Sequence, residues 1–131
     1  MTEMETAKRT ELARLFGPQI GKATEDITKV IHHSSTRKED GATKSSDIDI
    51  TIVVKNEFLA YTNIGGEMLS SLCQKILEPY KLKLGTGPME VHITRISQEA
   101  VDNPKKYISN VEGIKVLEEI LTKGEIVYEK I

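Results

Sequence analysis

The sequence predicts an α+β domain, in which a small mixed β-sheet packs against helices lying mainly on one of its faces. The first observation is that apolar residues recur at every second position over 46–54 and 89–94, which is the period of a β-strand, and the run at 27–32 also looks like a strand. The second is that apolar residues recur with helical spacing over 63–77 and 111–121. The elements follow in the order helix, strand, polar loop, strand, helix, strand, helix and tail, which is typical of an α+β domain.

Composition and charge narrow the class of protein. The net charge is −2 and 29% of the residues are charged, with both signs mixed, so no strongly basic field predicts a nucleic-acid groove. The only cysteine is Cys73, which excludes an internal disulfide and favours a reducing compartment. No apolar run approaches the ~20 residues of a membrane span, and the polar N-terminus does not resemble a signal peptide. We therefore expect a single cytoplasmic domain over 1–131, without a membrane partner.

The N-terminal segment, residues 1–26, is expected to be helical and to precede a core that spans 27–129. A capping-box spacing at Thr2 and Glu5 predicts a helix that starts there. Gly17-Pro18 predicts a break in this helix, after which a short second helix follows.

The elements downstream are separated by polar segments. A polar loop over 33–45 leads into the strand at 46–54. The helix at 63–77 ends before Pro79, and Cys73 is interpreted as one of its apolar core residues rather than a nucleophile. Gly124 is placed to end the last helix, after which a short strand or extended tail closes the chain.

The strand at 46–54 carries the residues with the clearest chemical meaning. Its isoleucines face one side of the strand, whereas Asp47 and Asp49 face the other, at a spacing of ~6.6 Å. Two carboxylates at that distance repel each other by ~2.5 kcal/mol at an effective dielectric constant of ~20. In a cleft such a pair requires cations, and a divalent metal site is one interpretation. A solvated strand face, on which water screens the repulsion, is the other.

A third carboxylate is expected from the strand at 89–94. On this strand Glu90 and His92 face one way and the apolar residues face the other. If the strand lies beside the acidic one, Glu90 meets Asp47 and Asp49 in one pocket. His92 shares the face of Glu90, and a half-buried, hydrogen-bonded histidine is the interpretation that its setting favours.

The run Ser46-Asp47-Ile48-Asp49, followed by an apolar strand and preceded by a loop with Ser34 and Arg37, resembles the nucleotidyltransferases of the DNA polymerase β superfamily. It is most similar to the minimal nucleotidyltransferases of bacteria and archaea. Their signature is a Gly-Ser at a strand end, a following Arg, a variable loop, Ser-Asp-x-Asp and a third acid on a later strand. Glu90 stands where the third acid belongs, and residues 124–129 look like the family's Gly-x-x-Leu/Val-Tyr-Glu tail.

The chain departs from that signature at two positions. His33-Ser34, or Ser34-Ser35 under a shifted alignment, stands where the family has Gly-Ser, and a glycine there lets the backbone approach the triphosphate closely. A histidine at this position therefore predicts that the phosphates are repositioned, that the triphosphate binds more weakly, or that catalysis is lost. Glu90 replaces the usual aspartate and adds one methylene, which changes the geometry of a metal ligand or base or leaves the site one ligand short.

The resemblance implies a nucleotidyltransferase fold and an activity that depends on Mg²⁺ or Mn²⁺. The reaction would transfer a nucleoside monophosphate from ATP or another nucleoside triphosphate to a protein or RNA acceptor. Asp47, Asp49 and Glu90 would be both the catalytic and the metal-binding residues. The residues expected to contact the nucleotide phosphates are Ser34, Ser35, Arg37, Lys44 and Ser46.

The partners follow from the same resemblance and from the short chain. A chain of 131 residues leaves little room for an acceptor domain, so the acceptor is expected at an interface with a second copy or a partner. Minimal family members are often encoded beside a small helical partner in toxin–antitoxin pairs, which implies such a partner here. One alternative is a catalytically impaired nucleotide-binding or partner-binding regulatory module of the same fold. Another is an α+β interaction domain that binds no nucleotide.

Overall fold

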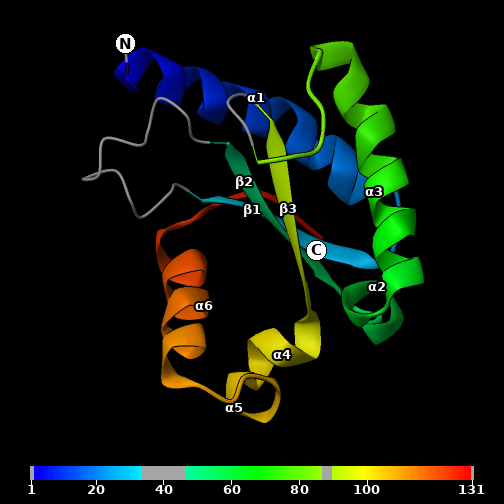
Figure 1. Cartoon of the computed structure of the whole chain (residues 1–131), viewed down its shortest axis with the longest axis vertical. Coiled ribbons are helices and arrows are strands. Elements are labelled where there is room, and N and C mark those ends of the chain that lie inside the picture. Colours follow the sequence, from blue (N-terminus) through cyan, green and yellow to red (C-terminus); the bar gives the residue numbers. More distant parts are fainter. Residues whose placement is uncertain (1, 34–46, 87–89, 131) are drawn as a thin grey trace.

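The computed structural model describes residues 2–33, 47–86 and 90–130, and it confirms the α+β class (Figure 1). The strands are β1 (Ile27–His33), β2 (Ile48–Val54), β3 (Val91–Ser97) and β4 (Glu125–Glu129). The helices are α1 (Thr2–Lys22), α2 (Glu57–Tyr61), α3 (Asn63–Leu77), α4 (Gln98–Asp102), α5 (Pro104–Tyr107) and α6 (Val111–Lys123), with a 3₁₀ turn, η3, at Glu78–Tyr80.

The four strands form one mixed sheet in the order β3-β2-β1-β4. The acidic strand β2 is central, antiparallel to β1 and parallel to β3. The C-terminal segment, which the sequence left open between strand and tail, is the edge strand β4 and pairs antiparallel with β1. The mixed sheet expected from the sequence is therefore confirmed.

The main hydrophobic core lies between the sheet and the helices α1 and α3. Every isoleucine of β2 is completely buried, and each points to this face, as the alternation predicts. Burying one such side chain contributes about 1.5–3 kcal/mol. The strand is therefore held with one face in the core, so its two aspartates must lie on the other.

Helix α1 runs without a break through Gly17 and Pro18, so the predicted interruption is wrong. Two glycines explain why the helix is retained. A Cβ at Gly17 would lie 2.3 Å from Cγ2 of Val127, and one at Gly21 would lie 2.0 Å from Cδ2 of Tyr128. Their missing side chains let α1 approach β4 closely, and the packing gained there and in the core offsets the cost of a proline inside a helix, about 3 kcal/mol.

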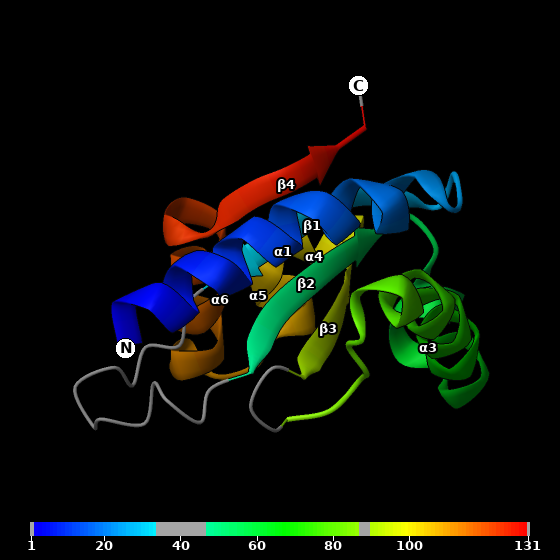
Figure 2. The same cartoon turned by 90° about the horizontal axis from the view of Figure 1, so that it is seen from above.

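Helices also lie against the opposite face of the sheet, where the sequence predicted few. Figure 2 shows α1 in front of the strands and α4, α5 and α6 behind them. Four further residues are buried but lie outside the main core cluster: Ile31, Val53, Ala100 and Leu117. The arrangement on mainly one face therefore holds for α1 and α3, whereas α4–α6 cover part of the other face.

His32 is half-buried on the core side of β1, and its burial makes stability depend on pH. The pKa of His32 is lowered to about 4, mainly by desolvation and then by the charge of His33. A histidine with a lowered folded pKa contributes stability above pH ~6.5 that is lost as the pH falls through about 4. Between pH 7 and pH 4, we expect protonation of this residue to lower the free energy of unfolding by about 2 kcal/mol. His32→Leu should remove that part of the loss. Urea unfolding at both pH values measures it, and an identical pH dependence in the two proteins would contradict the assignment.

Candidate functional site

The candidate site lies where β2 and β3 begin, on the sheet face opposite the main core. Asp47 directly precedes β2 and Asp49 is its second residue. The parallel register pairs Asp49 with His92 of β3. Because side chains alternate along a strand, Asp47, Asp49 and His92 all project from the same face. The predicted orientation of the two aspartates is therefore confirmed.

The three side chains converge. Ligand atoms of Asp47, Asp49 and His92 all lie within 4.8 Å of one another. Nδ1 of His92 is 3.6 Å from Oδ1 of Asp49, and the two side chains are 49% and 17% exposed, respectively. The aspartate is thus largely enclosed while the imidazole remains open to solvent, so the group can be reached from outside.

The pair of aspartates is electrostatically unfavourable without a cation. The pKa of Asp49 is raised to about 6, mainly by burial and then by the hydrogen bond and negative charge of Asp47, against the opposing effect of His92. A carboxylate that is desolvated and beside a second carboxylate is stabilised by a positive ion at short range. This is the electrostatic setting expected of a metal site.

His33 borders this group from the other side of β2. It is the last residue of β1 and pairs with Asp49, and its Nε2 lies 3.0 Å from Oγ1 of Thr51. Burial lowers the pKa of His33, as does the charge of His92, whereas Asp47 raises it. His33 is therefore a neutral ring held by Thr51. The backbone at His33 is a regular strand, so its own conformation does not call for glycine, and the expected effect on a bound triphosphate stays a prediction.

Glu90 lies beside the group in the backbone but its side chain takes another direction. The Glu90 carbonyl accepts a hydrogen bond of 2.7 Å from the N–H of Ile48. Its carboxylate pairs with Lys83, with Nζ 3.6 Å from Oε2, and a Cβ at Gly85 would lie 2.0 Å from Oε1. Among the described residues, the close ligand atoms come from Asp47, Asp49 and His92, and Glu90 lies outside that group. The structure thus brings together two of the three predicted acids.

The other sequence-based candidates divide into two sets. The residues expected to contact phosphate, which are Ser34, Ser35, Arg37, Lys44 and Ser46, lie outside the described residues. Cys73 is buried in the core, and burial raises the pKa of its thiol to about 12, which agrees with a structural role.

His92 is the site residue that the sequence did not identify as a metal ligand. The sequence placed His92 correctly on the polar face of its strand, and this placement was the only feature of the sequence that indicated a place in the site. What makes it a ligand candidate is the parallel register, which sets it opposite Asp49. His32 and His33, in contrast, were expected on opposite faces and are: their partners in β2 are Ile50 and Asp49.

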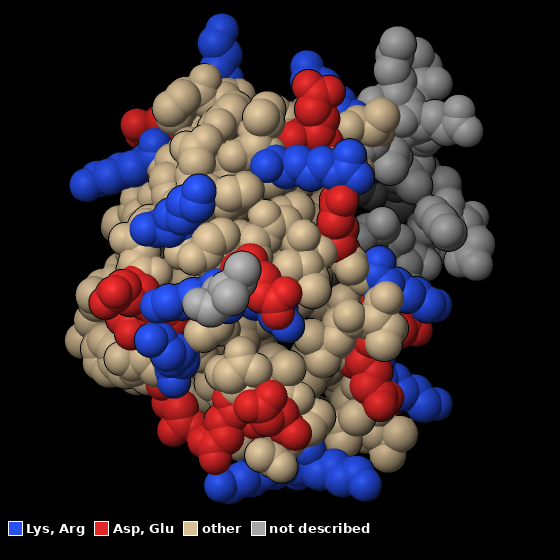
Figure 3. All heavy atoms as spheres, turned by 180° about the vertical axis from the view of Figure 1, so that it is seen from behind, with Lys and Arg blue, Asp and Glu red and all other residues tan. Residues whose placement is uncertain are grey.

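The surface charge agrees with the mixed composition. On the face seen in Figure 3, Lys and Arg side chains alternate with Asp and Glu, and no large area carries one sign. Ion pairs join Arg14 to Glu125 at 2.8 Å and Lys29 to Glu129 at 3.5 Å. This face therefore offers no continuous basic surface to a nucleic-acid backbone.

Comparisons with other proteins leave the family resemblance as a prediction. No protein-family model matches the chain, and no curated protein matches it significantly. Within the described ranges, no helix has both the length and the apolar character needed to cross a membrane.

Proposed function

We propose that this chain is a divalent-metal-dependent nucleotidyltransferase, which transfers a nucleoside monophosphate from a nucleoside triphosphate to a protein or RNA acceptor. The observation that carries the proposal is the convergence of Asp47, Asp49 and His92 within 4.8 Å on one sheet face. The run Ser46-Asp47-Ile48-Asp49, which resembles the superfamily's Ser-Asp-x-Asp, supplies two of these three residues.

The donor set fits Mg²⁺ or Mn²⁺. Carboxylate oxygens suit both ions, and an imidazole nitrogen is more readily accepted by Mn²⁺ than by Mg²⁺. Asp47 and Asp49 would hold the ion, with His92 as a third ligand. When bound, such an ion neutralises phosphate charge and lowers the pKa of an attacking hydroxyl group.

The chain's own residues would prepare the site in three ways. Asp47 and Asp49 lie on a strand whose other face is locked in the core, so their relative positions are set by the sheet. His33 is held by Thr51, which keeps a neutral ring beside the carboxylates. The exposed His92 leaves the site open on one side, where an acceptor held by a second copy or a partner chain would enter.

A regulatory module of the same fold, able to bind nucleotide but catalytically impaired, is the second candidate. The Glu90 carboxylate favours it, because this side chain pairs with Lys83 and lies outside the group of close ligand atoms. A site that lacks its third acid would bind a metal and triphosphate without an efficient base for the acceptor hydroxyl.

Labelled nucleotide separates the two candidates. We expect the protein, incubated with α-labelled ATP or CTP, cell extract and Mg²⁺ or Mn²⁺, to transfer label to an acceptor. Asp47→Ala should reduce this transfer by about 10²–10³-fold, because it removes a metal ligand. Asp102→Ala, which removes an exposed aspartate on α4, is the matched control and should retain full transfer.

Glu90→Gln then tests the third acid. Loss of transfer in this variant would show that Glu90 turns toward the aspartates when substrate is bound, whereas unchanged transfer would assign no chemistry to it. Absence of transfer by the parent, together with a nucleotide-dependent rise in melting temperature, would support the regulatory module. Absence of both would exclude the two candidates.

A further inference from the structure

The outer edge of β3 carries backbone groups that point away from the sheet. β3 is an edge strand, with β2 as its one strand neighbour in the sheet order. The N–H of Ile48 donates to the carbonyl of Glu90 at 2.7 Å, which fixes the phase of the parallel ladder. In that phase the backbone groups of residues 92, 94 and 96 point to β2, and those of 91, 93 and 95 point outward.

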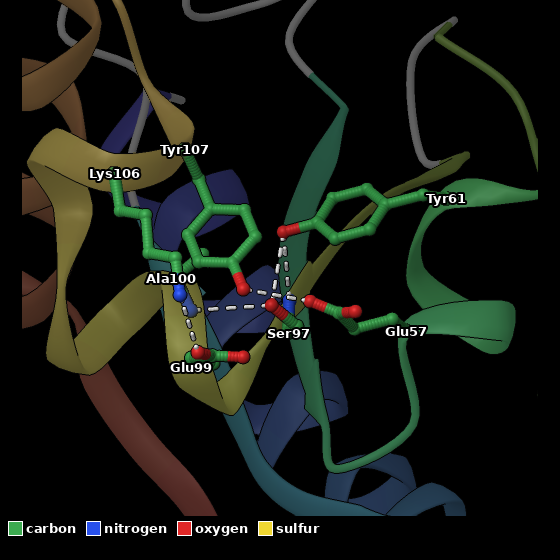
Figure 4. A network of polar contacts seen from close by, with 7 residues as sticks. All are labelled: Glu57, Tyr61, Ser97, Glu99, Ala100, Lys106 and Tyr107. Carbon is green, nitrogen blue, oxygen red and sulfur yellow. Dashed lines mark hydrogen bonds and ion pairs between the residues drawn. The ribbon is translucent and has the colours of Figure 1, made fainter.

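Both ends of this edge are already paired. At the start, Val91 donates its N–H to the Lys83 carbonyl at 2.9 Å and accepts from the N–H of Gly85 at 3.0 Å. At the end, the N–H of Ser97 donates to the hydroxyl of Tyr61 at 3.4 Å, and the two side-chain oxygens lie 3.0 Å apart (Figure 4).

The paired end at Ser97 is rigidly built. The ring of Tyr61 stacks on that of Tyr107, with 6.3 Å between centroids. The hydroxyl of Tyr107 donates to Glu57 at 2.8 Å, which ties α5 to α2 (Figure 4). Tyr61 is therefore held in place and closes the edge at this end.

Between these ends the edge is open. The N–H and C=O groups of Ile93 and Arg95 have no hydrogen-bond partner within the part of the chain that the structure describes. Unpaired groups along a strand edge are a template for another strand, because pairing there adds hydrogen bonds at no cost to the existing ladder.

A groove of about 790 Å³ lies directly against this open edge. Ile93 and Arg95 of β3 form one wall. The other wall is α3, which contributes Asn63, Gly66, Glu67, Leu69, Ser70 and Ser71. A strand edge facing a helix across a groove is the geometry in which domains bind extended peptides by adding a strand to the sheet.

Arg95 places a positive charge on the β3 wall of this groove, and Glu67 lies on the α3 wall. Its Nη1 donates to the carbonyls of Leu59 and Thr62, at 2.8 and 3.0 Å, which fixes the guanidinium at the end of α2. A Cβ at Gly66 would lie 2.9 Å from Cζ, so the glycine allows the guanidinium to lie against α3. Arg95 makes no ion pair with any residue that the structure describes, and its remaining N–H groups can donate to a carboxylate.

We propose that the groove between α3 and β3 binds an extended segment of a partner protein that carries an acidic side chain. The segment would pair with the N–H and C=O groups of Ile93 and Arg95, and its carboxylate would bind the guanidinium of Arg95. A second copy of this chain is a poorer occupant. Paired through β3, it would bring its own α3 to the same face of the joined sheet, whereas a lone extended segment brings no helix.

Backbone exchange on the isotope-labelled full chain tests the proposal. The probe is a pool of seven-residue peptides with a central Glu and flanking Val, Thr, Ile or Ser, and the matched pool has Gln at the centre. We expect the Glu pool to slow hydrogen exchange of the Ile93 and Arg95 amides. We expect the Gln pool to bind about tenfold more weakly, as befits the loss of one charge-assisted contact.

Variants locate the binding. Ser70→Trp fills the groove from an exposed position on α3 and should abolish peptide binding. Thr122→Trp makes the same change at an exposed position on α6 and should not affect it. Arg95→Gln should remove the preference for Glu over Gln while the Glu pool still protects Ile93. Asp47→Ala should leave peptide binding unchanged, because the inference does not depend on the metal site.

Three results would overturn the proposal. The first is no binding by either pool up to about 1 mM peptide. The second is binding that leaves the Ile93 and Arg95 amides unprotected or survives Ser70→Trp. The third is protection of these amides that rises with protein concentration in the absence of peptide, which would make a second copy the occupant.

Discussion

Replacing Asp49 with asparagine is expected to stabilise the metal-free protein at pH 7 by about 1–2 kcal/mol and to abolish its binding of divalent metal. The carboxylate is 17% exposed and lies beside Asp47, and burial raises the pKa of Asp49 to about 6. Its ionised form is therefore disfavoured by the fold at neutral pH. An amide of the same shape removes the charge, and with it both the cost and the proposed metal ligand.

The pH dependence of stability shows why Asp49→Asn should stabilise the protein rather than destabilise it. Because the folded pKa of Asp49 is raised above its ordinary value of 3.8, the stability that the group contributes is present below pH 3.8 and is lost as the pH rises through about 6. Asp49→Asn should lack this loss. Urea unfolding between pH 4 and pH 8, without metal, measures the difference between the two proteins.

Melting temperatures measured with added divalent metal test the second part of this prediction, the loss of metal binding. Mn²⁺ should raise the melting temperature of the parent and of Asp102→Asn, an exposed control, but not that of Asp49→Asn. A variant that is less stable than the parent at pH 7, or that still gains stability from Mn²⁺, would show that Asp49 is a structural residue and not a ligand held at a cost.

Gly65→Ala is expected to destabilise the protein by about 2–3 kcal/mol, although alanine favours a helix over glycine by about 1 kcal/mol. A Cβ at Gly65 would lie 2.3 Å from the carbonyl oxygen of Phe58 and 2.7 Å from Cα of Leu59. These are backbone atoms of α2, which cannot rotate away. The substitution must therefore push α3 from α2 and weaken the N-cap that Thr62 gives to Gly65.

Gly66→Ala is the matched control for that change. Its Cβ would meet the guanidinium of Arg95, a side-chain group that can shift more easily than backbone, although its hydrogen bonds to the carbonyls of Leu59 and Thr62 would weaken. We expect a loss within about 1 kcal/mol. Thermal unfolding of the two variants measures the contrast, and equal losses would mean that the tight α2–α3 contact does not limit stability.

The central strand β2 and the core helix α3 were predictable from the sequence. The alternation in β2 placed its isoleucines in the core and its aspartates on the other face, because burial of one face leaves no second register. Helix α3 has the predicted bounds, 63–77, but its N-cap is Thr62, whose side chain accepts from Gly65. Most of these predictions therefore follow from the local spacing of apolar residues and from the chemistry of helix caps.

Two features of the helices were not predictable from local signals. Helix α2 spans five residues, too few to show a helical period, although Asn56 caps it by accepting from the N–H of Phe58. Helix α1 passes through Pro18 because contacts with β4, far away in the sequence, favour its continuation. Tertiary packing outweighed local propensity in the second case.

The sequence by itself determined which side chains of the site share a face, because a strand has a period of two and one face must be buried. It also determined that Asp47 and Asp49 are neighbours on that face. Only the tertiary structure decided that β2 and β3 are parallel in the register that sets His92 against Asp49. It also decided that the Glu90 carboxylate pairs with Lys83, since register and side-chain direction depend on contacts between segments that local periodicity does not encode.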